Sequence, residues 1–200
     1  MCAVIAATVL LAACGSIRGH TTRSRTAPLA GIPRGLLARA RPIGRGSRFH
    51  PPAAGPVVGA CRPRLGARYG VHVEVFGPDR VVIVPARIGV RPPVGLSAGR
   101  VSSAACYGSL VTLDATGLVL VRPGSVLSLS DLFRAWGQPL SARRLASFSA
   151  PCGGQVAVFV GGRRRRGAPG RVPLSNHAEI VLEVGPHVPP HGSYTFPPGT

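Results

Sequence analysis

The segment Gly95-Leu96-Ser97-Ala98-Gly99 has the residue types and spacing of a serine nucleophile, G-x-S-x-G. In serine hydrolases this motif needs a strand before the serine and a helix after it, so that the hydroxyl is exposed on a strained turn. Here Arg91-Pro92-Pro93 precedes the segment and no helical pattern follows it. We therefore interpret the motif as a chance match in a loop, and we expect no catalytic residue and no enzyme activity.

Two imidazoles near the C-terminus, in His187-Val188-Pro189-Pro190-His191, have the residue type of metal ligands. An extended polyproline segment rises about 3.1 Å per residue, which places the two rings roughly 12 Å apart. Because that distance is too long for one ion, we expect no shared metal at His187 and His191.

Residues 163–166 are four arginines with a glycine on each side. Such a run can bind a polyanion, but no aromatic residues that stack on bases lie among them. We interpret the run as a solvated hairpin loop that can also contact anionic lipid.

The first sixteen residues are uncharged, and an apolar run over residues 3–13 ends in Leu11-Ala12-Ala13-Cys14, followed by Gly15 and Ser16. About eleven apolar residues are too few to cross a bilayer core, which needs about 20, but they fit the apolar region of a cleaved signal. The pattern is typical of bacterial lipoproteins, in which Cys14 becomes the N-terminus and carries lipid, including palmitate. The alternative is an uncleaved apolar N-terminus, because no basic residue precedes Ala3.

The chain is strongly basic, with 24 basic and 6 acidic residues and a formal charge of +18. Eleven of its arginines and no acidic residue lie between Gly15 and Gly70, among many Gly and Pro residues. Residues 15–60 bury too little apolar surface to fold, so we expect them to form a tether. Each basic residue near an anionic membrane adds about 1 kcal/mol of binding. We expect a location on the extracytoplasmic face of a cell membrane, the anionic membrane surface and an envelope protein as partners, and no nucleic acid.

Beyond the tether, runs of apolar and β-branched residues predict strands at residues 71–76, 81–84, 110–113, 118–121, 155–160 and 178–184. Turns at residues 77–79 and 114–117 join the first four strands into two hairpins. Two Gly-rich stretches, residues 91–103 and 163–170, are predicted to be loops.

Residues 129–136 have the pattern of an amphipathic helix, with Leu129, Leu132, Phe133 and Trp136 on one stripe. Ser128 followed by Asp131 is a capping box, and Gly137 followed by Pro139 ends the helix. We expect Trp136 to anchor the core.

These elements predict an α+β fold, in which one main helix packs across a small mixed sheet, with a β-grasp arrangement as the specific expectation. The expected organisation is a lipoprotein signal peptide (residues 1–13), a basic tether (14–60), the α+β domain (61–185) and a proline-rich tail along the surface (186–200).

Seven motifs in the domain resemble those of an uncharacterised family of secreted or membrane-anchored bacterial proteins, over about residues 59–197. They are VPARIG (84–89), CY (106–107), DATG (114–117), LSL (127–129), FRAWGQPL (133–140), HAEIVLEVG (177–185) and YTFP (194–197). The family brings no known activity, so the resemblance implies no catalytic residues and no cofactor.

Members of this family typically carry H-x-H-x-H on the first strand and Leu-His-Thr-His-Asp before the second turn, which suits a metal site. Here the corresponding residues are Gly70-Val71-His72-Val73-Glu74 and Leu110-Val111-Thr112-Leu113-Asp114. His72, Glu74 and Asp114 remain, and one histidine with two carboxylates can hold a metal. We favour the alternative that the site is lost and these are ordinary polar residues of the strands.

An exported chain permits disulfides, and Cys61, Cys106 and Cys152 remain once Cys14 carries lipid. The resemblance implies a Cys61–Cys106 disulfide with Cys152 left over, and Cys106–Cys152 is the rival pairing. The sequence therefore predicts a lipid-anchored extracytoplasmic binding or structural protein without catalysis. The alternative is a metal-binding protein that uses the remaining histidine and carboxylates.

Overall fold

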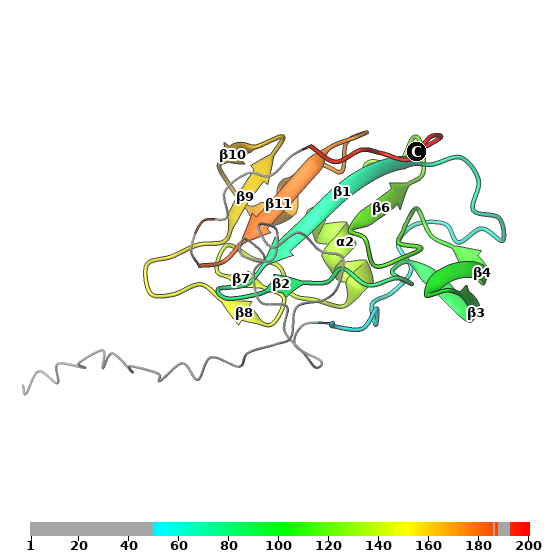
Figure 1. The fold of residues 1–200 in the computed structure, drawn as a ribbon, viewed down its shortest axis with the longest axis horizontal. Helices are drawn as coiled ribbons and strands as arrows, with labels where there is room; N and C mark the ends of the chain where they lie inside the picture. Colours follow the sequence, from blue (N-terminus) through cyan, green and yellow to red (C-terminus); the bar gives the residue numbers. More distant parts are fainter. Residues whose placement is uncertain (1–49, 186, 188–192) are drawn as a thin grey trace, which may run out of the picture. The chain divides into compact units, whose positions relative to one another are not determined.

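Strand β1 lies at the centre of a mixed sheet, where it pairs in parallel with the last strand, β11, and antiparallel with β6 (Figure 1). A computed structural model describes residues 50–185, 187 and 193–200. The sheet has seven strands in the order β10-β9-β11-β1-β6-β5, with β2 also paired to β1. Its strands are β1 (Tyr69–Phe76), β2 (Val81–Val82), β5 (Leu110–Val111), β6 (Leu118–Val121), β9 (Ala157–Val160), β10 (Arg163–Arg165) and β11 (Glu179–Glu183).

The remaining elements are not part of this sheet. They are the hairpin β3 (Val90–Ser97) and β4 (Arg100–Tyr107), the hairpin β7 (Arg144–Leu145) and β8 (Phe148–Ser149), the helix α2 (Leu129–Trp136) and a 3-10 turn η1 (Pro169–Arg171). A mostly mixed sheet with one α-helix among the described residues confirms the predicted α+β class. The predicted hairpins β1–β2 and β5–β6 are also present.

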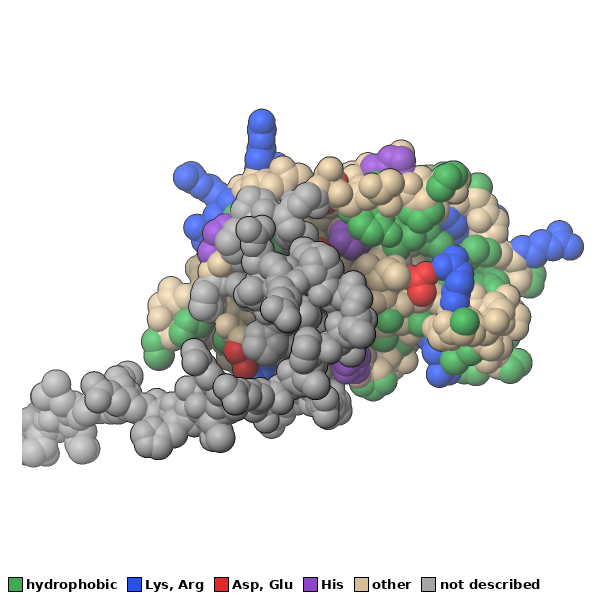
Figure 2. Space-filling model, viewed as in Figure 1, with side chains coloured by type: hydrophobic (Ala, Val, Ile, Leu, Met, Phe, Trp, Pro, Cys, Tyr) green, Lys and Arg blue, Asp and Glu red, His purple; other side chains and the backbone are tan. Residues whose placement is uncertain are grey.

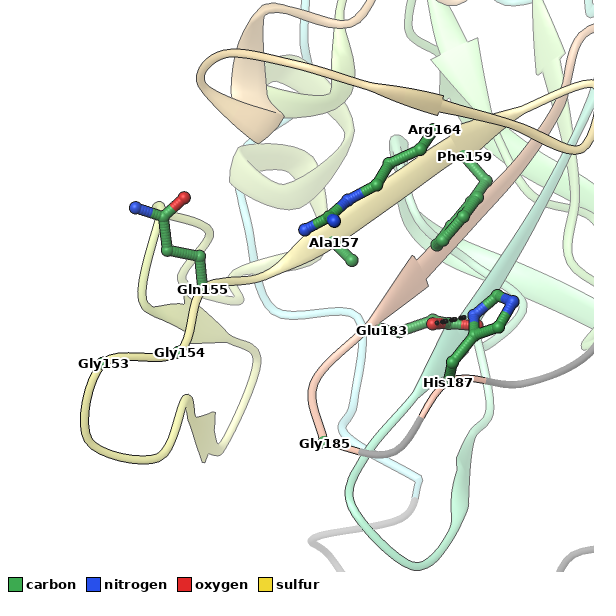
Figure 3. A pocket seen from close by; sticks show the side chains of 9 residues that line it. All are labelled: Gly153, Gly154, Gln155, Ala157, Phe159, Arg164, Glu183, Gly185 and His187. Carbon is green, nitrogen blue, oxygen red and sulfur yellow. Dashed lines mark hydrogen bonds and ion pairs between the residues drawn. The ribbon is translucent and has the colours of Figure 1, made fainter.

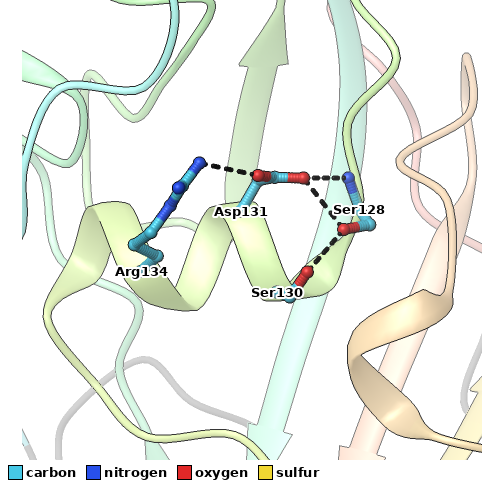
Figure 4. Close-up of polar contacts among 4 residues, drawn as sticks. All are labelled: Ser128, Ser130, Asp131 and Arg134. Carbon is cyan, nitrogen blue, oxygen red and sulfur yellow. Dashed lines mark hydrogen bonds and ion pairs between the residues drawn. The ribbon is translucent and has the colours of Figure 1, made fainter.

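Helix α2 has the predicted bounds, because a capping box closes its N-terminal end and a glycine closes its C-terminal end. The Ser128 backbone N–H donates to Asp131 Oδ2 at 3.0 Å and the Ser128 hydroxyl donates to the same oxygen at 2.9 Å (Figure 4). At the other end Gly137 has φ +78°, the left-handed conformation that a glycine adopts without strain. The helix therefore begins and ends where its own sequence satisfies the exposed backbone groups.

The main core lies between α2 and one face of the sheet. Val71, Val73 and Val75 of β1 point to this side and are at most 1% exposed, and Trp136 is fully buried. The Trp136 indole donates to the Pro51 carbonyl at 3.1 Å, and the Trp136 carbonyl accepts from Ala54 at 3.1 Å. The structure thus places the end of the predicted tether against the helix.

The predicted loop at residues 91–103 is wrong, because this segment forms the β3–β4 hairpin. Ala98 (φ +48°) and Gly99 (φ +77°) make its tight turn. The hairpin is a two-stranded sheet, so both strands are edges, and its register shifts between Arg91 and Val94. Proline is tolerated at edges and bulges, which explains how Pro92 and Pro93 fit within a strand.

The predicted loop at residues 163–170 is wrong in its first part, because Arg163–Arg165 is the edge strand β10. Gly161 (φ +53°) and Gly162 (φ +72°) turn the chain from β9 into β10. Charged side chains on an edge strand discourage pairing with another chain. The arginine run is thus both exposed and part of the sheet.

The predicted signal, Cys14 and most of the predicted tether lie outside the described residues. Within the part of the chain that the structure describes, no helix has the length and apolar character needed to span a membrane.

We predict that Asp131→Ala lowers the free energy of unfolding by about 1 kcal/mol, because the helix loses its capping carboxylate. Arg134→Ala is the control, since it removes only an exposed ion pair to Asp131 and should cost less than about 0.5 kcal/mol. Urea denaturation of both variants measures the difference. Equal losses would show that the cap does not stabilise this helix.

Candidate functional site

The sheet face that points away from α2, here called the outer face, carries half of the acidic residues of the chain. In the register of β1 and β11, His72 lies beside Glu179, Glu74 beside Val181 and Phe76 beside Glu183. Alternate residues of a strand share a face, so Glu74, Glu179 and Glu183 all belong to the outer face. Three of the six carboxylates of a chain with a charge of +18 are therefore gathered on one side of the sheet.

A groove of about 630 Å³ lies at the β9–β11 end of the outer face (Figure 3). Two strands and two loops position its polar groups. Residues 153–155 precede β9, Arg164 comes from β10, Glu183 ends β11, and His187 follows after Gly185. The lining residues are Gly153, Gly154, Gln155, Ala157, Phe159, Arg164, Glu183, Gly185 and His187.

A histidine–carboxylate pair forms one wall of the groove. The Glu183 side chain is only 4% exposed, and its Oε2 lies 2.9 Å from His187 Nδ1. The His187 ring also stacks on Phe159, with ring centroids 4.9 Å apart. A carboxylate at Nδ1 holds the proton there in the neutral ring, so Nε2 is left as an acceptor. The pair therefore fixes the orientation of the imidazole.

The side chains of the groove are suited to binding a polar ligand. They comprise an amide, a guanidinium, an imidazole, a carboxylate and an aromatic ring, without a hydroxyl, thiol or amine nucleophile among the lining residues. Convergent polar groups beside an aromatic surface are typical of ligand sites. Arg164 extends along the groove above Ala157, where its charge is available to a ligand (Figure 3).

Two of the three residues considered as a remnant metal site, His72 and Asp114, have other partners. His72 stacks on Tyr194 with centroids 3.8 Å apart, and its Nε2 lies 3.2 Å from the Thr116 carbonyl oxygen. Asp114 accepts hydrogen bonds from Arg100 and from the Thr116 hydroxyl. Among residues 50–185, 187 and 193–200, no three His, Cys, Asp or Glu side chains are grouped closely enough to hold a metal ion. The structure thus does not assemble His72, Glu74 and Asp114 as ligands.

Aromatic residues of the C-terminal tail lie against the first strand instead. A Cβ atom added at Gly70 would lie 2.9 Å from Phe196 Cδ1 and 3.0 Å from Leu118 Cδ1, closer than real side chains approach. His177 stacks on Phe196 with centroids 4.5 Å apart. Phe196 and Leu118 therefore fill the space that a side chain at position 70 would need.

Ser97 lies at the exposed end of β3, where a hairpin turn rather than a helix follows it. This placement lacks the strand–turn–helix arrangement that a serine nucleophile of this motif needs. His191, the second imidazole of the tail motif, lies outside the described residues. His187 lines the groove, where it contacts Glu183 and Phe159.

The structure pairs Cys61 with Cys106, whose Cα atoms are 5.4 Å apart, as the resemblance implied. The rival pairing of Cys106 with Cys152 is therefore wrong, and Cys152 is exposed and free. The disulfide joins the segment before β1 to the end of β4.

The sequence interpretation missed the groove, because it depends on contacts between β9, β10, β11 and the tail. A local signal exists in Glu183, a carboxylate that ends a buried strand four residues before His187. No family model matches the chain, and no significant similarity links it to a curated protein or to a solved structure.

We predict that Gly70→His destabilises the fold by about 1–3 kcal/mol, because the new side chain overlaps Phe196 and Leu118. Phe196→Ala alone measures the cost of losing the ring. In the double variant the loss should be smaller than the sum, because Phe196→Ala removes the ring that the new histidine overlaps. Strict additivity in chemical denaturation would show that the tail does not pack on Gly70.

We predict that replacing both Cys61 and Cys106 by serine lowers the free energy of unfolding by about 4 kcal/mol, because the 45-residue loop is no longer closed in the unfolded chain. Cys152→Ser is the matched control and should change stability by less than about 0.5 kcal/mol, since its side chain is exposed. Denaturation under non-reducing conditions compares the variants. If Cys152→Ser were as damaging as the double change, the disulfide would involve Cys152.

Proposed function

We propose that the chain is a lipid-anchored protein of the extracytoplasmic face of a cell membrane. In this proposal its α+β domain binds an envelope component or ligand and catalyses no reaction. The lipid and the basic tether hold the domain at an anionic membrane surface, and the groove on the outer face of the sheet meets the ligand.

The main support for the membrane location is the apolar run that ends at Leu11-Ala12-Ala13-Cys14. The Cys61–Cys106 disulfide supports it independently, because disulfides persist mainly in oxidising compartments outside the cytoplasm. The arginines of residues 15–50 add electrostatic attraction to anionic lipid, which complements a single thiol-linked anchor.

The composition of the groove supports binding rather than catalysis. Its imidazole is oriented by Glu183, but the lining supplies no nucleophile that His187 would activate. On the face that Figure 2 shows, arginine side chains project at separated places instead of forming one continuous band. This face thus lacks the clustered basic stripe that nucleic-acid-binding proteins present.

We also propose a β-grasp-like core for the domain. In support, the first and last strands of the sheet, β1 and β11, lie side by side and parallel, flanked by β6 and β9. Helix α2 comes between β6 and β9 in the chain and packs on one face. A fold of this kind carries many functions, so the proposed role rests on the anchor and the groove.

We predict that cells expressing the protein incorporate radiolabelled palmitate into it, and that Cys14→Ala abolishes the label because it removes the thiol that receives lipid. Cys61→Ala is the matched control and should retain the label. Absence of label from the unmodified protein, or retention in Cys14→Ala, would contradict lipid anchoring at this residue.

A further inference from the structure

Three arginines line a hollow that lies away from the groove, between the segment before β1 and the loop that follows β6. The hollow has a volume of about 840 Å³. We call it the arginine hollow; its lining residues are Arg62, Pro63, Arg64, Leu65, Gly66, Ala67, Arg122 and Pro123. Every acidic residue of the chain lies in the described part, and none of the six is among these residues. The hollow is therefore cationic without a carboxylate to balance it.

Arg122 is held in place by carbonyl groups. Its Nη1 donates to the Ala60 carbonyl at 3.0 Å, and its Nη2 donates to the Tyr107 and Gly108 carbonyls at 3.1 Å each. These bonds fix the guanidinium but leave its charge uncompensated, because a carbonyl carries only a partial negative charge.

Arg68 follows the lining segment 62–67 in the chain and, like Arg122, binds backbone carbonyls of the segment 107–109. It is 7% exposed, and its guanidinium donates to the Leu65, Gly108 and Ser109 carbonyls at 2.9–3.1 Å. Two guanidinium groups thus converge on residues 107–109. A buried charge that lacks a counter-ion is costly, so a nearby anion would stabilise this arrangement.

The ionisation of both residues reflects this environment. Burial, together with the charge of Arg122, lowers the pKa of Arg68 to about 10. Burial and the charge of Arg62 lower the pKa of Arg122. Burial thus disfavours the charged forms of both groups, and a bound anion would favour them.

The backbone around the arginine hollow is fixed before any ligand arrives. Arg62 exchanges two backbone hydrogen bonds with Tyr107, at 3.0 and 2.8 Å. Its neighbour Cys61 is joined by the disulfide to Cys106. Arg62 and Arg64 are exposed, so their guanidinium groups can bind a ligand directly. A site whose backbone is already fixed loses less entropy on binding.

We propose that the arginine hollow is a binding site for a phosphate group, in which Arg62 and Arg64 donate to the phosphate oxygens and Arg122 and Arg68 supply fixed positive charge. Arginine binds phosphate oxygens through paired N–H donors, and a doubly charged tetrahedral anion suits several cations better than one carboxylate does. Both an anionic lipid headgroup and a soluble phosphate carry this chemistry. The site goes beyond the proposed function and does not depend on lipid at Cys14.

The test uses the full-length protein in a neutral detergent and measures pyrophosphate binding by calorimetry at constant ionic strength. The variant Arg62→Gln with Arg64→Gln removes the direct donors. The matched control, Arg143→Gln with Arg163→Gln, removes two exposed arginines outside the hollow and so lowers the net charge equally. Arg64→Gln alone serves as a second variant, since Arg64 takes no part in the backbone pairing with Tyr107.

We expect the unmodified protein and the control to bind pyrophosphate alike, and the Arg62/Arg64 variant to bind at least tenfold more weakly, because charged hydrogen bonds are lost. Arg64→Gln should fall between them, with unchanged thermal stability. Equal weakening in the control would show general charge attraction and overturn the site. Absence of pyrophosphate binding to the unmodified protein would overturn it as well.

A second arm separates the two sources of phosphate. It measures the gain in flotation when phosphatidic acid is added to phosphatidylcholine vesicles, again for the Arg62/Arg64 variant and its control, because an acyl anchor binds both kinds of vesicle. Weaker flotation of the Arg62/Arg64 variant identifies a lipid headgroup as a ligand of the hollow. Equal flotation of the two, together with the difference in pyrophosphate binding, identifies a soluble phosphate.

Discussion

Charge balance constrains this protein more than any other property, since 24 arginines face only six carboxylates. Three of these carboxylates form ion pairs, namely Asp79 with Arg80, Asp114 with Arg100 and Asp131 with Arg134, and Glu183 is hydrogen-bonded to His187. Glu74 and Glu179 lie on the outer face of the sheet. Most arginines must therefore find water, backbone carbonyls or an external anion. The position of the arginines follows from this shortage of partners.

Arginines in different parts of the chain compensate for the lack of carboxylate partners in different ways. The edge strand β10 exposes its arginines to water, where isolated charges cost little. Arg68 and Arg122 bind carbonyls of residues 107–109, which satisfies their donors without neutralising them. The basic segment that follows Cys14 would meet the anionic surface of a membrane. The proposed membrane anchor and phosphate site join the last two observations in one account, because each would place excess positive charge beside an external anion.

Local patterns were sufficient to predict helix α2 and strands β1, β6 and β11, because their alternation, caps and turns act within a few residues. The hairpin β3–β4 was missed, since Pro92 and Gly95 argue against a strand unless both strands are edges. The candidate sites were harder to predict from the sequence. The groove depends on the register of β9 with β11, and the arginine hollow depends on a disulfide across 45 residues. His72 was considered as a remnant metal ligand only as the alternative, and its stacking on Tyr194 was not predicted because it joins residues far apart in the sequence.

The claim on which this account depends is that the domain is delivered outside the cytoplasm and held there by lipid. Intact-mass spectrometry of the protein extracted from cell membranes tests it directly. The account predicts a chain that starts at Cys14, carries added acyl mass and has two hydrogens fewer than the reduced form, from the disulfide. A mass equal to that of the unmodified chain with Met1 in place would contradict it.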